Sequence, residues 1–251
     1  MTGAGVGPGA GGDGVVHPRL AARRRSTRAE TWWGKAWVRA VEESAYAEGD
    51  LAAARSLSRS GRVGAIEVGA GSAVAVVDDG SDGGGRWTVR IEVPVLDDTG
   101  AETLVEAVAA QAGRVGALLA GDLPHELVEH AEEAGVELLP YGGELVASCT
   151  CAGWVDPCVH ALGVLYQLTW LLEADPFVLV HLRGLGREEV LARLHARVVE
   201  PEERMSGDGP GGDDEPDLAT AYDAAARAAR VLELLDARGA GEAAPDLSHL
   251  F

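Results

Sequence analysis

The residues with the clearest chemistry are four metal-ligand types gathered within positions 149–160. The chain has three cysteines, and all of them lie in this stretch as Cys149, Cys151 and Cys158, with His160 two residues after the last. Three thiolates and one imidazole are a complete tetrahedral donor set for Zn²⁺. Because a closed set of this kind leaves no position for water, it predicts one structural zinc ion and not a catalytic one.

The spacing of these donors lets both pairs reach one ion. Along an extended backbone, Cys149 and Cys151 point to the same side. In a regular helix, positions i and i+2 turn about 200° apart, so Cys158 and His160 cannot both lie in mid-helix and share a metal. The Asp-Pro pair at 156–157 is typical of a helix start, and we expect the second donor pair in that irregular first turn. A disulfide is the alternative use of two cysteines, but it leaves the third cysteine and His160 without a role.

The pattern resembles the SWIM zinc finger, a family found with SWI2/SNF2 helicases, plant transposases and a signalling kinase. The four candidate ligands match the four ligand positions of that family one for one. Trp154 and the Trp-rich segment 31–37 also resemble bacterial members that often lie beside helicase-like partners, and the likeness extends over about residues 30–198. Family members bind DNA or protein. The resemblance therefore implies an accessory protein for a SWI2/SNF2-type helicase without fixing the ligand.

The charge of the chain bears on the choice between these ligands. The formal net charge is −19, which repels phosphate backbones at long range. Residues 1–62 hold ten basic and six acidic residues, whereas the remainder holds eleven and thirty-four. Val159 also stands between the last two ligands, where bacterial members of the family often carry a basic residue. The charge favours a protein partner over nucleic acid, with a local basic arm on an acidic body.

The basic arm and the tryptophans after it are the candidate contact region outside the metal stretch. The arginines are either solvated side chains or contacts to nucleic acid or to an acidic partner. Helical spacing places Trp33 and Trp37 on one stripe, which is expected to face the core, whereas Trp32 falls off that stripe. A base-stacking platform is the alternative for these tryptophans, and for Trp32 the core and the platform are equally well supported. The candidate contact residues are Arg19, Arg23, Arg24, Arg25, Arg28 and Trp32.

The sequence predicts a cytoplasmic protein that does not enter a membrane. The first eighteen residues are Gly-rich and lack a charged start followed by an apolar core. The best apolar run, 161–172, is shorter than the ~20 residues needed to span a bilayer. Metal-ligand cysteines without a disulfide framework fit a reducing compartment.

Alternation and helical spacing predict an α+β fold. Residues 62–95 are expected to form a small antiparallel three-stranded sheet, clearest where Trp87 and Val89 alternate with polar residues. Helices accompany this sheet from about residue 31 onward, and a SWIM zinc module packed on a helical segment at 158–173 follows it. The expected organisation is a disordered Gly/Arg-rich arm (1–30), an α+β domain (31–140), the SWIM zinc finger with the following helices (141–199), an acidic linker (200–216), an amphipathic helix that docks in cis or in trans (217–237) and a disordered tail (238–251).

The expected function is a zinc-binding, non-catalytic interaction module that mediates protein–protein contacts. Every cysteine is used as a ligand, and no Ser-His-Asp order, carboxylate pair or phosphate loop marks an enzyme. Direct binding of DNA or RNA is the alternative, and a metalloenzyme is a weaker one. Trp154 is expected to pack on the apolar side of the ligands, with a role as a partner anchor as its alternative. Because structural zinc contributes to folding, loss of one ligand is expected to unfold residues 145–173 locally.

Overall fold

The computed structural model describes residues 14–24, 28–78, 80 and 84–205. The predicted α+β class is confirmed within these residues. The strands are β1 (Val15–His17), β2 (Val63–Gly69), β3 (Ser72–Asp78), β4 (Arg86–Glu92) and β5 (Val146–Cys149). The helices are α1 (Trp32–Ser44), α2 (Glu48–Arg59), α3 (Asp98–Ala109), α4 (Ala112–Leu119), α5 (His125–Glu133), the short 3-10 helix η1 (Gly142–Glu144), α6 (Val159–Ala174), α7 (Phe177–Leu182) and α8 (Arg187–Met205).

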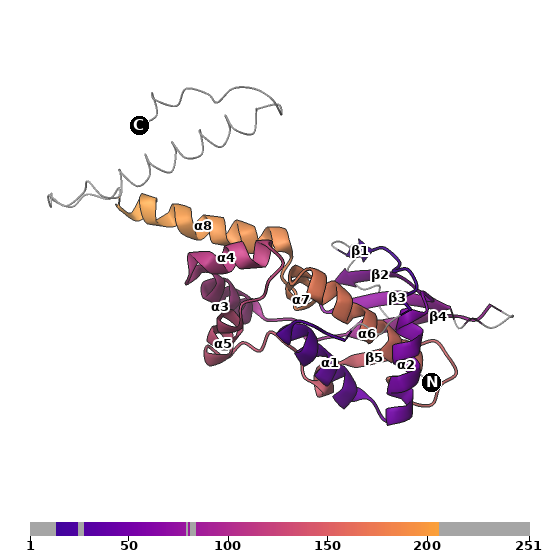
Figure 1. Cartoon of the computed structure of the whole chain (residues 1–251). Helices are drawn as coiled ribbons and strands as arrows, with labels where there is room; N and C mark the ends of the chain where they lie inside the picture. The colour runs from indigo at the N-terminus through magenta and orange to yellow at the C-terminus, as the bar shows by residue number, and fades with distance from the viewer. Residues whose placement is uncertain (1–13, 25–27, 79, 81–83, 206–251) are drawn as a thin grey trace, which may run out of the picture. The chain divides into compact units, whose positions relative to one another are not determined.

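The strands form one antiparallel sheet in chain order, β1-β2-β3-β4-β5 (Figure 1). The predicted three-stranded meander is present as β2, β3 and β4, but the expectation of only three strands is wrong. Strand β1 pairs Val15 with Val68 and His17 with Ile66, and β5 pairs with β4 at the opposite edge. The prediction of a disordered arm over 1–30 therefore fails at β1, because the open edge of β2 offers backbone groups that this short segment satisfies.

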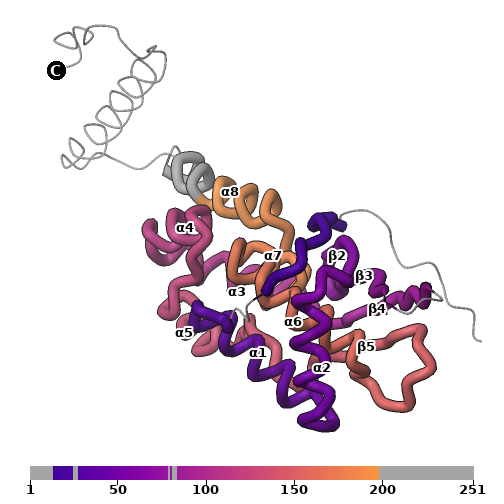
Figure 2. The backbone as a smooth tube through the Cα atoms, turned by 45° about the vertical axis from the view of Figure 1, so that its right-hand side comes forward, coloured from indigo at the N-terminus to yellow at the C-terminus, as the bar shows by residue number. Residues whose placement is uncertain are grey.

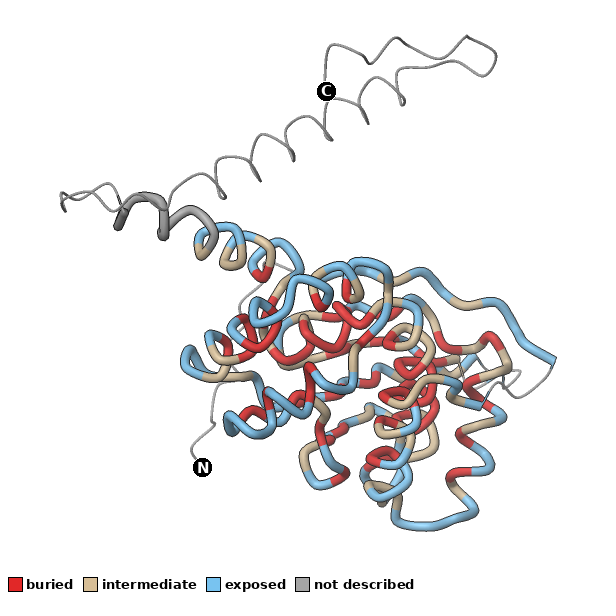
Figure 3. Tube along the Cα trace, turned by 60° about the vertical axis from the view of Figure 1, so that its left-hand side comes forward, coloured by how far each residue is buried: buried red, intermediate tan, exposed pale blue. Residues whose placement is uncertain are grey.

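Helix α6 is the centre of the core. It contacts β4 and β5 of the sheet and also packs against α1 and α2, and ten of its residues are buried. Figure 3 shows the buried positions gathered in the interior of the fold. The indole N–H of Trp37 donates to the Leu165 carbonyl at 3.1 Å, and that of Trp33 donates to the Leu172 carbonyl at 3.0 Å. The predicted core role of Trp33 and Trp37 is thus correct.

Helix α2 was not predicted. Its buried residues include Leu51, Ala54 and Leu57, which lie at helical spacing on one face. Gly163 on α6 allows the close approach of α2, since a Cβ at that position would lie 2.9 Å from the Leu57 side chain. The buried Gln167 amide donates to the Ser58 carbonyl at 2.7 Å. Helices α2 and α6 therefore form a tightly packed pair.

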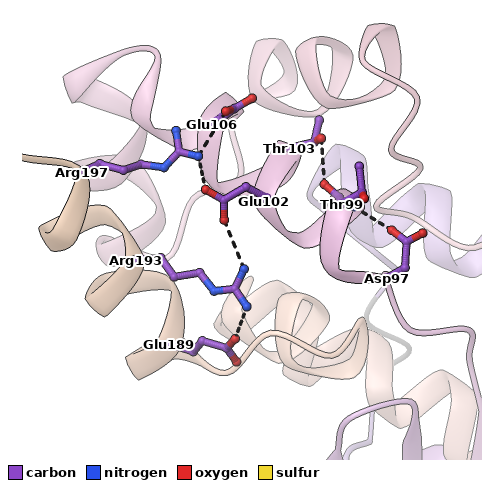
Figure 4. Close-up of polar contacts among 9 residues, drawn as sticks. Asp97, Thr99, Glu102, Thr103, Glu106, Glu189, Arg193 and Arg197 are labelled. Atoms are coloured by element: carbon purple, nitrogen blue, oxygen red, sulfur yellow. Dashed lines mark hydrogen bonds and ion pairs between the residues drawn. The ribbon is translucent and has the colours of Figure 1, made fainter. Parts of the chain in front are cut away.

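The remaining helices surround two buried arginines. Arg183 donates to the carbonyls of Pro94 (2.7 Å) and Glu137 (2.8 Å), and Arg114 donates to the carbonyl of Ala107 (2.5 Å). Figure 4 shows the link between α3 and α8, where Glu102 accepts from Arg193 and Arg197. Pairs of this exposure each stabilise a fold by less than about 1 kcal/mol.

Two predicted boundaries differ from the structure. Strand β5 completes the sheet and α6 completes the core, so 31–140 and 141–199 are not separate domains but parts of one compact unit that extends to Val199. The predicted linker over 200–216 is wrong over its first six residues, because α8 continues to Met205. The rest of that linker, the helix predicted at 217–237 and the tail at 238–251 lie outside the described residues. Within the described part of the chain, no helix is long and apolar enough to cross a membrane.

Candidate metal centre

The first donor pair lies at the end of an edge strand. Cys149 is the last residue of β5 and is in register with Val89 of β4. The pairing continues one residue further, because the Thr150 amide donates to the Thr88 carbonyl at 3.0 Å and Thr150 Oγ1 accepts from the Thr88 amide at 2.9 Å. The sheet thus fixes the backbone between Cys149 and Cys151 before any metal binds.

The second donor pair lies at the start of α6. Cys158 is the N-cap, with extended backbone angles of φ −77° and ψ 172°, and His160 is the second residue of the helix. The predicted position in the first turn is correct, but the helix begins after the 156–157 Asp-Pro pair and not within it. Because α6 is buried along most of its length, it holds this pair rigidly against the sheet.

The four donor atoms form a cluster that fits zinc. They all lie within 4.8 Å of one another. Cys151 Sγ is 3.6 Å from Cys158 Sγ, and His160 Nδ1 is 3.9 Å from Cys158 Sγ and 4.0 Å from Cys149 Sγ. Zinc bond lengths place the corners of a tetrahedral site about 3.6–3.8 Å apart, whereas sulfurs in a disulfide are ~2.05 Å apart. All three cysteines are free thiols, and the disulfide alternative is excluded.

Burial changes the acidity of the sulfurs. It raises the pKa of the Cys149 thiol to about 12 and also raises the pKa of Cys158. The metal-free thiols of Cys149 and Cys158 therefore hold their protons at neutral pH, and a zinc ion must displace these protons to bind. The donor set can hold one Zn²⁺ through three sulfurs and one imidazole nitrogen. A filled tetrahedron stabilises the loop and gives substrate no place on the metal.

Trp154 lies differently from the prediction. It was expected to pack against the ligands, but its side chain is 101% exposed. Figure 2 shows the chain between β5 and α6 as a wide loop at the edge of the fold. Both ends of this loop carry zinc donors, and the loop presents Trp154 to solvent without folding it back on those donors.

Three of the six candidate contact residues, Arg19, Arg23 and Trp32, lie against other parts of the fold. Arg19 Nε donates to the Gly61 carbonyl at 2.7 Å, and Arg23 stacks over Trp170, with its Cζ 4.4 Å from the ring centroid. Trp32 is half-buried and donates its indole N–H to the Leu123 carbonyl at 2.9 Å. Arg24 and Arg28 are exposed, and Arg25 lies outside the described residues. In the described part of the chain, the structure does not bring these residues to the metal donors, and their role as contacts stays a prediction.

The comparison with known families agrees with the geometry of the donors. Residues 135–168 match the SWIM zinc finger. These residues are a SWIM zinc finger. The finger takes in η1, β5, the loop with Trp154 and the first part of α6. The finger is therefore part of the sheet and the core and not a separately folded domain.

A similar protein is known from Mycobacterium tuberculosis. The chain is 29% identical to the uncharacterised protein Rv2102 of that organism over 198 residues. The match covers 76% of this chain and 67% of the relative, which is far more than the finger alone. No solved structure matches the chain. The similarity therefore extends over much of the sheet and the helices. Because the relative is uncharacterised, the similarity does not indicate an activity.

Proposed function

We propose that this protein is a non-catalytic interaction module in which a structural zinc ion holds the SWIM finger in shape for a protein partner. The observation that carries the proposal is the full exposure of Trp154 on a loop whose two ends hold the zinc donors. The closed set of three thiolates and one imidazole supports a structural role for the metal. Reduced thiols of this kind suit a reducing compartment.

A clamped, exposed tryptophan is well suited to anchor a partner. Single exposed apolar residues are common on protein surfaces, but a tryptophan has a large apolar surface to bury and few rotamers to lose. Tryptophan is accordingly enriched among the few interface residues that dominate binding energy. Zinc at both ends of the loop lowers the ordering cost that a free loop would incur on binding. The finger thus presents Trp154 already close to a bound arrangement.

The finger itself is a poor site for nucleic acid. Residues 149–160 contain no lysine or arginine and one aspartate, and the chain as a whole carries a net charge of −19. Affinity for DNA or RNA backbones comes mainly from cationic side chains. These features support a protein partner for the finger, and the resemblance to helicase-associated members suggests a SWI2/SNF2-type helicase.

Binding to a purified SWI2/SNF2-type helicase from the same organism tests this proposal. Immobilised wild-type protein is compared with Trp154→Ala and with Tyr46→Ala, which removes an 83% exposed aromatic ring far from the finger in sequence. We expect the wild type to bind and Trp154→Ala to lose about thirtyfold in affinity, the effect of a ~2 kcal/mol hot spot. Tyr46→Ala should bind as the wild type does. Equal affinities of all three proteins, or no binding by any of them, would contradict the proposal.

A further inference from the structure

A cavity of about 570 Å³ opens where α1, α2 and α6 meet. It lies outside the metal loop, which is the segment 150–157 between β5 and the second donor pair. Its volume lies within the range of sites that bind small molecules. Each of the three helices contributes side chains, as does the segment before α1.

The lining is strongly cationic in a protein whose net charge is negative. Five of its side chains are lysine or arginine and one is a carboxylate, Glu42. Arg55 pairs with Glu42 at 2.5 Å, and Arg39 pairs with Glu43 at 2.8 Å. The other three cations, Arg28, Lys35 and Arg59, have no ion-pair partner among the residues that the structure describes. Like charges on a concave wall repel one another, and an anionic ligand would relieve that repulsion.

A buried hydroxyl on the inner wall also lacks a partner. Tyr166 is only 7% exposed. Its hydroxyl lies close to the Arg55–Glu42 pair, but it makes no hydrogen bond of ordinary geometry within the described part of the chain. The Arg55 guanidinium lies over its ring, with Cζ 5.5 Å from the centroid. Buried hydroxyls are normally hydrogen-bonded, and each exception calls for an explanation. A ligand atom in the cavity would supply the missing partner.

We infer that this cavity binds the phosphate group and part of the ring system of a nucleotide, either a free nucleotide or one unit of a single-stranded nucleic acid. The unpaired cations suit phosphate oxygens. Val38, Ala29 and the half-buried Trp170 give the same cavity an apolar side, which suits a base or sugar more than a bare ion. The site is separate from Trp154, so it does not depend on the proposed function of the finger.

Fluorescence anisotropy with a labelled twelve-nucleotide oligo(dT) tests the inference on the full, zinc-loaded chain. The double variant Lys35→Gln/Arg59→Gln removes two unpaired cations. The control Arg187→Gln/Arg193→Gln removes two arginines of α8, both ion-paired and far from the cavity in sequence, and changes the net charge by the same amount. We expect the wild type and the control to bind alike and the cavity variant to bind at least tenfold more weakly. The slope of log K against log salt should fall by about 1.4 in the cavity variant, ~0.7 for each lost phosphate contact on a single strand.

Competition separates the two sources of the ligand. Displacement of the oligonucleotide by ATP or AMP at similar concentration would show that the cavity takes a free nucleotide. Displacement by unlabelled oligonucleotide alone would show that it holds one unit of a strand, and either result supports the inference. Absence of binding by oligonucleotide and by nucleotide, or equal weakening in the cavity and control variants, would overturn it.

Tyr166→Phe provides a second readout that a purely structural role would not give. The change removes the unpartnered hydroxyl and keeps the ring, so the thermal stability of the free protein should stay the same or rise. If the hydroxyl contacts the ligand, affinity should fall by about three- to tenfold. Unchanged affinity in Tyr166→Phe would exclude the hydroxyl from the site, and combined with unchanged affinity in the cationic variant it would refute the inference.

Discussion

Beside the sulfur of Cys151, the chain has a glycine with little space around it. A Cβ on Gly153 would lie 3.2 Å from Cys151 Sγ and 3.5 Å from Cys158 Cβ. The 3.2 Å contact requires a shift of a few tenths of an ångström, and the neighbouring atom is the sulfur of a zinc ligand, whereas the 3.5 Å contact is an ordinary one. The type of residue at position 153 therefore influences the metal through packing, although it donates nothing to it.

Gly153→Ala is expected to weaken zinc binding without abolishing it. Overpacking by one methyl group costs about 1 kcal/mol at a tight site, or roughly fivefold in zinc affinity. Competition with a chromophoric chelator measures this affinity. Gly113→Ala is the matched control, because nothing lies within 4 Å of a Cβ at that position. A zinc affinity equal to that of the wild type would show that the loop has more room than the structure indicates.

Cys151→Ser tests the donor set more severely. Loss of a direct ligand should lower zinc affinity by more than ~100-fold, since even the loss of a supporting contact around a metal costs ten- to 100-fold. The protein should then leave gel filtration with much less than one zinc per chain, as measured by atomic emission. Ser148→Ala, which changes an exposed position of β5 three residues earlier, should retain its zinc. Full zinc content in Cys151→Ser would remove Cys151 from the site.

At the scale of the elements, α1 and the metal loop hold tryptophans of opposite burial. Trp37 is fully buried and hydrogen-bonded to α6, whereas Trp154 is fully exposed. Trp37→Ala should lower the free energy of unfolding by about 3–5 kcal/mol, because it leaves a cavity in the core. Trp154→Ala should change it by no more than ~0.5 kcal/mol. Urea denaturation of both variants measures the two effects, and a large loss of stability in Trp154→Ala would mean that its ring is packed in solution.

Strand β1 is expected to be sensitive to pH through His17. Burial lowers the pKa of His17 below 6.5, opposed by nearby Asp175 and assisted by nearby His181. A lowered folded-state pKa means that the neutral form favours the folded strand. This stabilisation is complete above pH 6.5 and is lost as the pH falls through the folded-state pKa.

Hydrogen exchange of the β1 amides between pH 7 and 5 measures this loss, after correction for the intrinsic rate. Protection of residues 15–17 should decrease toward pH 5 in the wild type and change less in His17→Gln, which does not titrate. The same change in both proteins would show that another group controls the edge strand.

At the scale of the whole molecule, the zinc finger is built into the core. The sequence suggests that loss of zinc unfolds residues 145–173 locally, but the structure favours a smaller effect. Strand β5 is paired with β4, and ten residues of α6 are buried between the sheet and two helices. These contacts do not need the metal, whereas the loop between the two donor pairs has few of its own.

Chelation of zinc should therefore loosen the loop and leave α6 folded. Hydrogen exchange should increase strongly over residues 152–156, which lie beyond the strand pairing of Thr150, and little over 162–172. The comparison is made on the wild type before and after removal of the metal, with zinc added back as the control for reversibility. Equal loss of protection in both segments would show instead that residues 145–173 unfold together when zinc is removed.

The sequence was sufficient to predict features that depend on the spacing of nearby residues. It was not sufficient for features that depend on packing between distant segments. The donor set depends on twelve consecutive residues, so Cys149 and His160 could be assigned with only a strand and a helix start in view. Strand β1 depends on an open edge that β2 provides almost fifty residues later, and Val15–His17 carries little signal of its own. The cavity depends on three helices that meet, of which α2 had gone unrecognised. The exposure of Trp154 depends on the direction of a loop, which spacing does not give.

X-ray absorption at the zinc edge of the purified wild-type protein tests the central claim most directly. The account predicts one zinc ion per chain with three sulfur neighbours at about 2.3 Å and one nitrogen neighbour at about 2.0 Å, with no bound water. A spectrum with two sulfurs, or with an oxygen neighbour that exchanges with solvent, would contradict a closed structural site. Such a result would reopen the question of whether the metal takes part in a reaction.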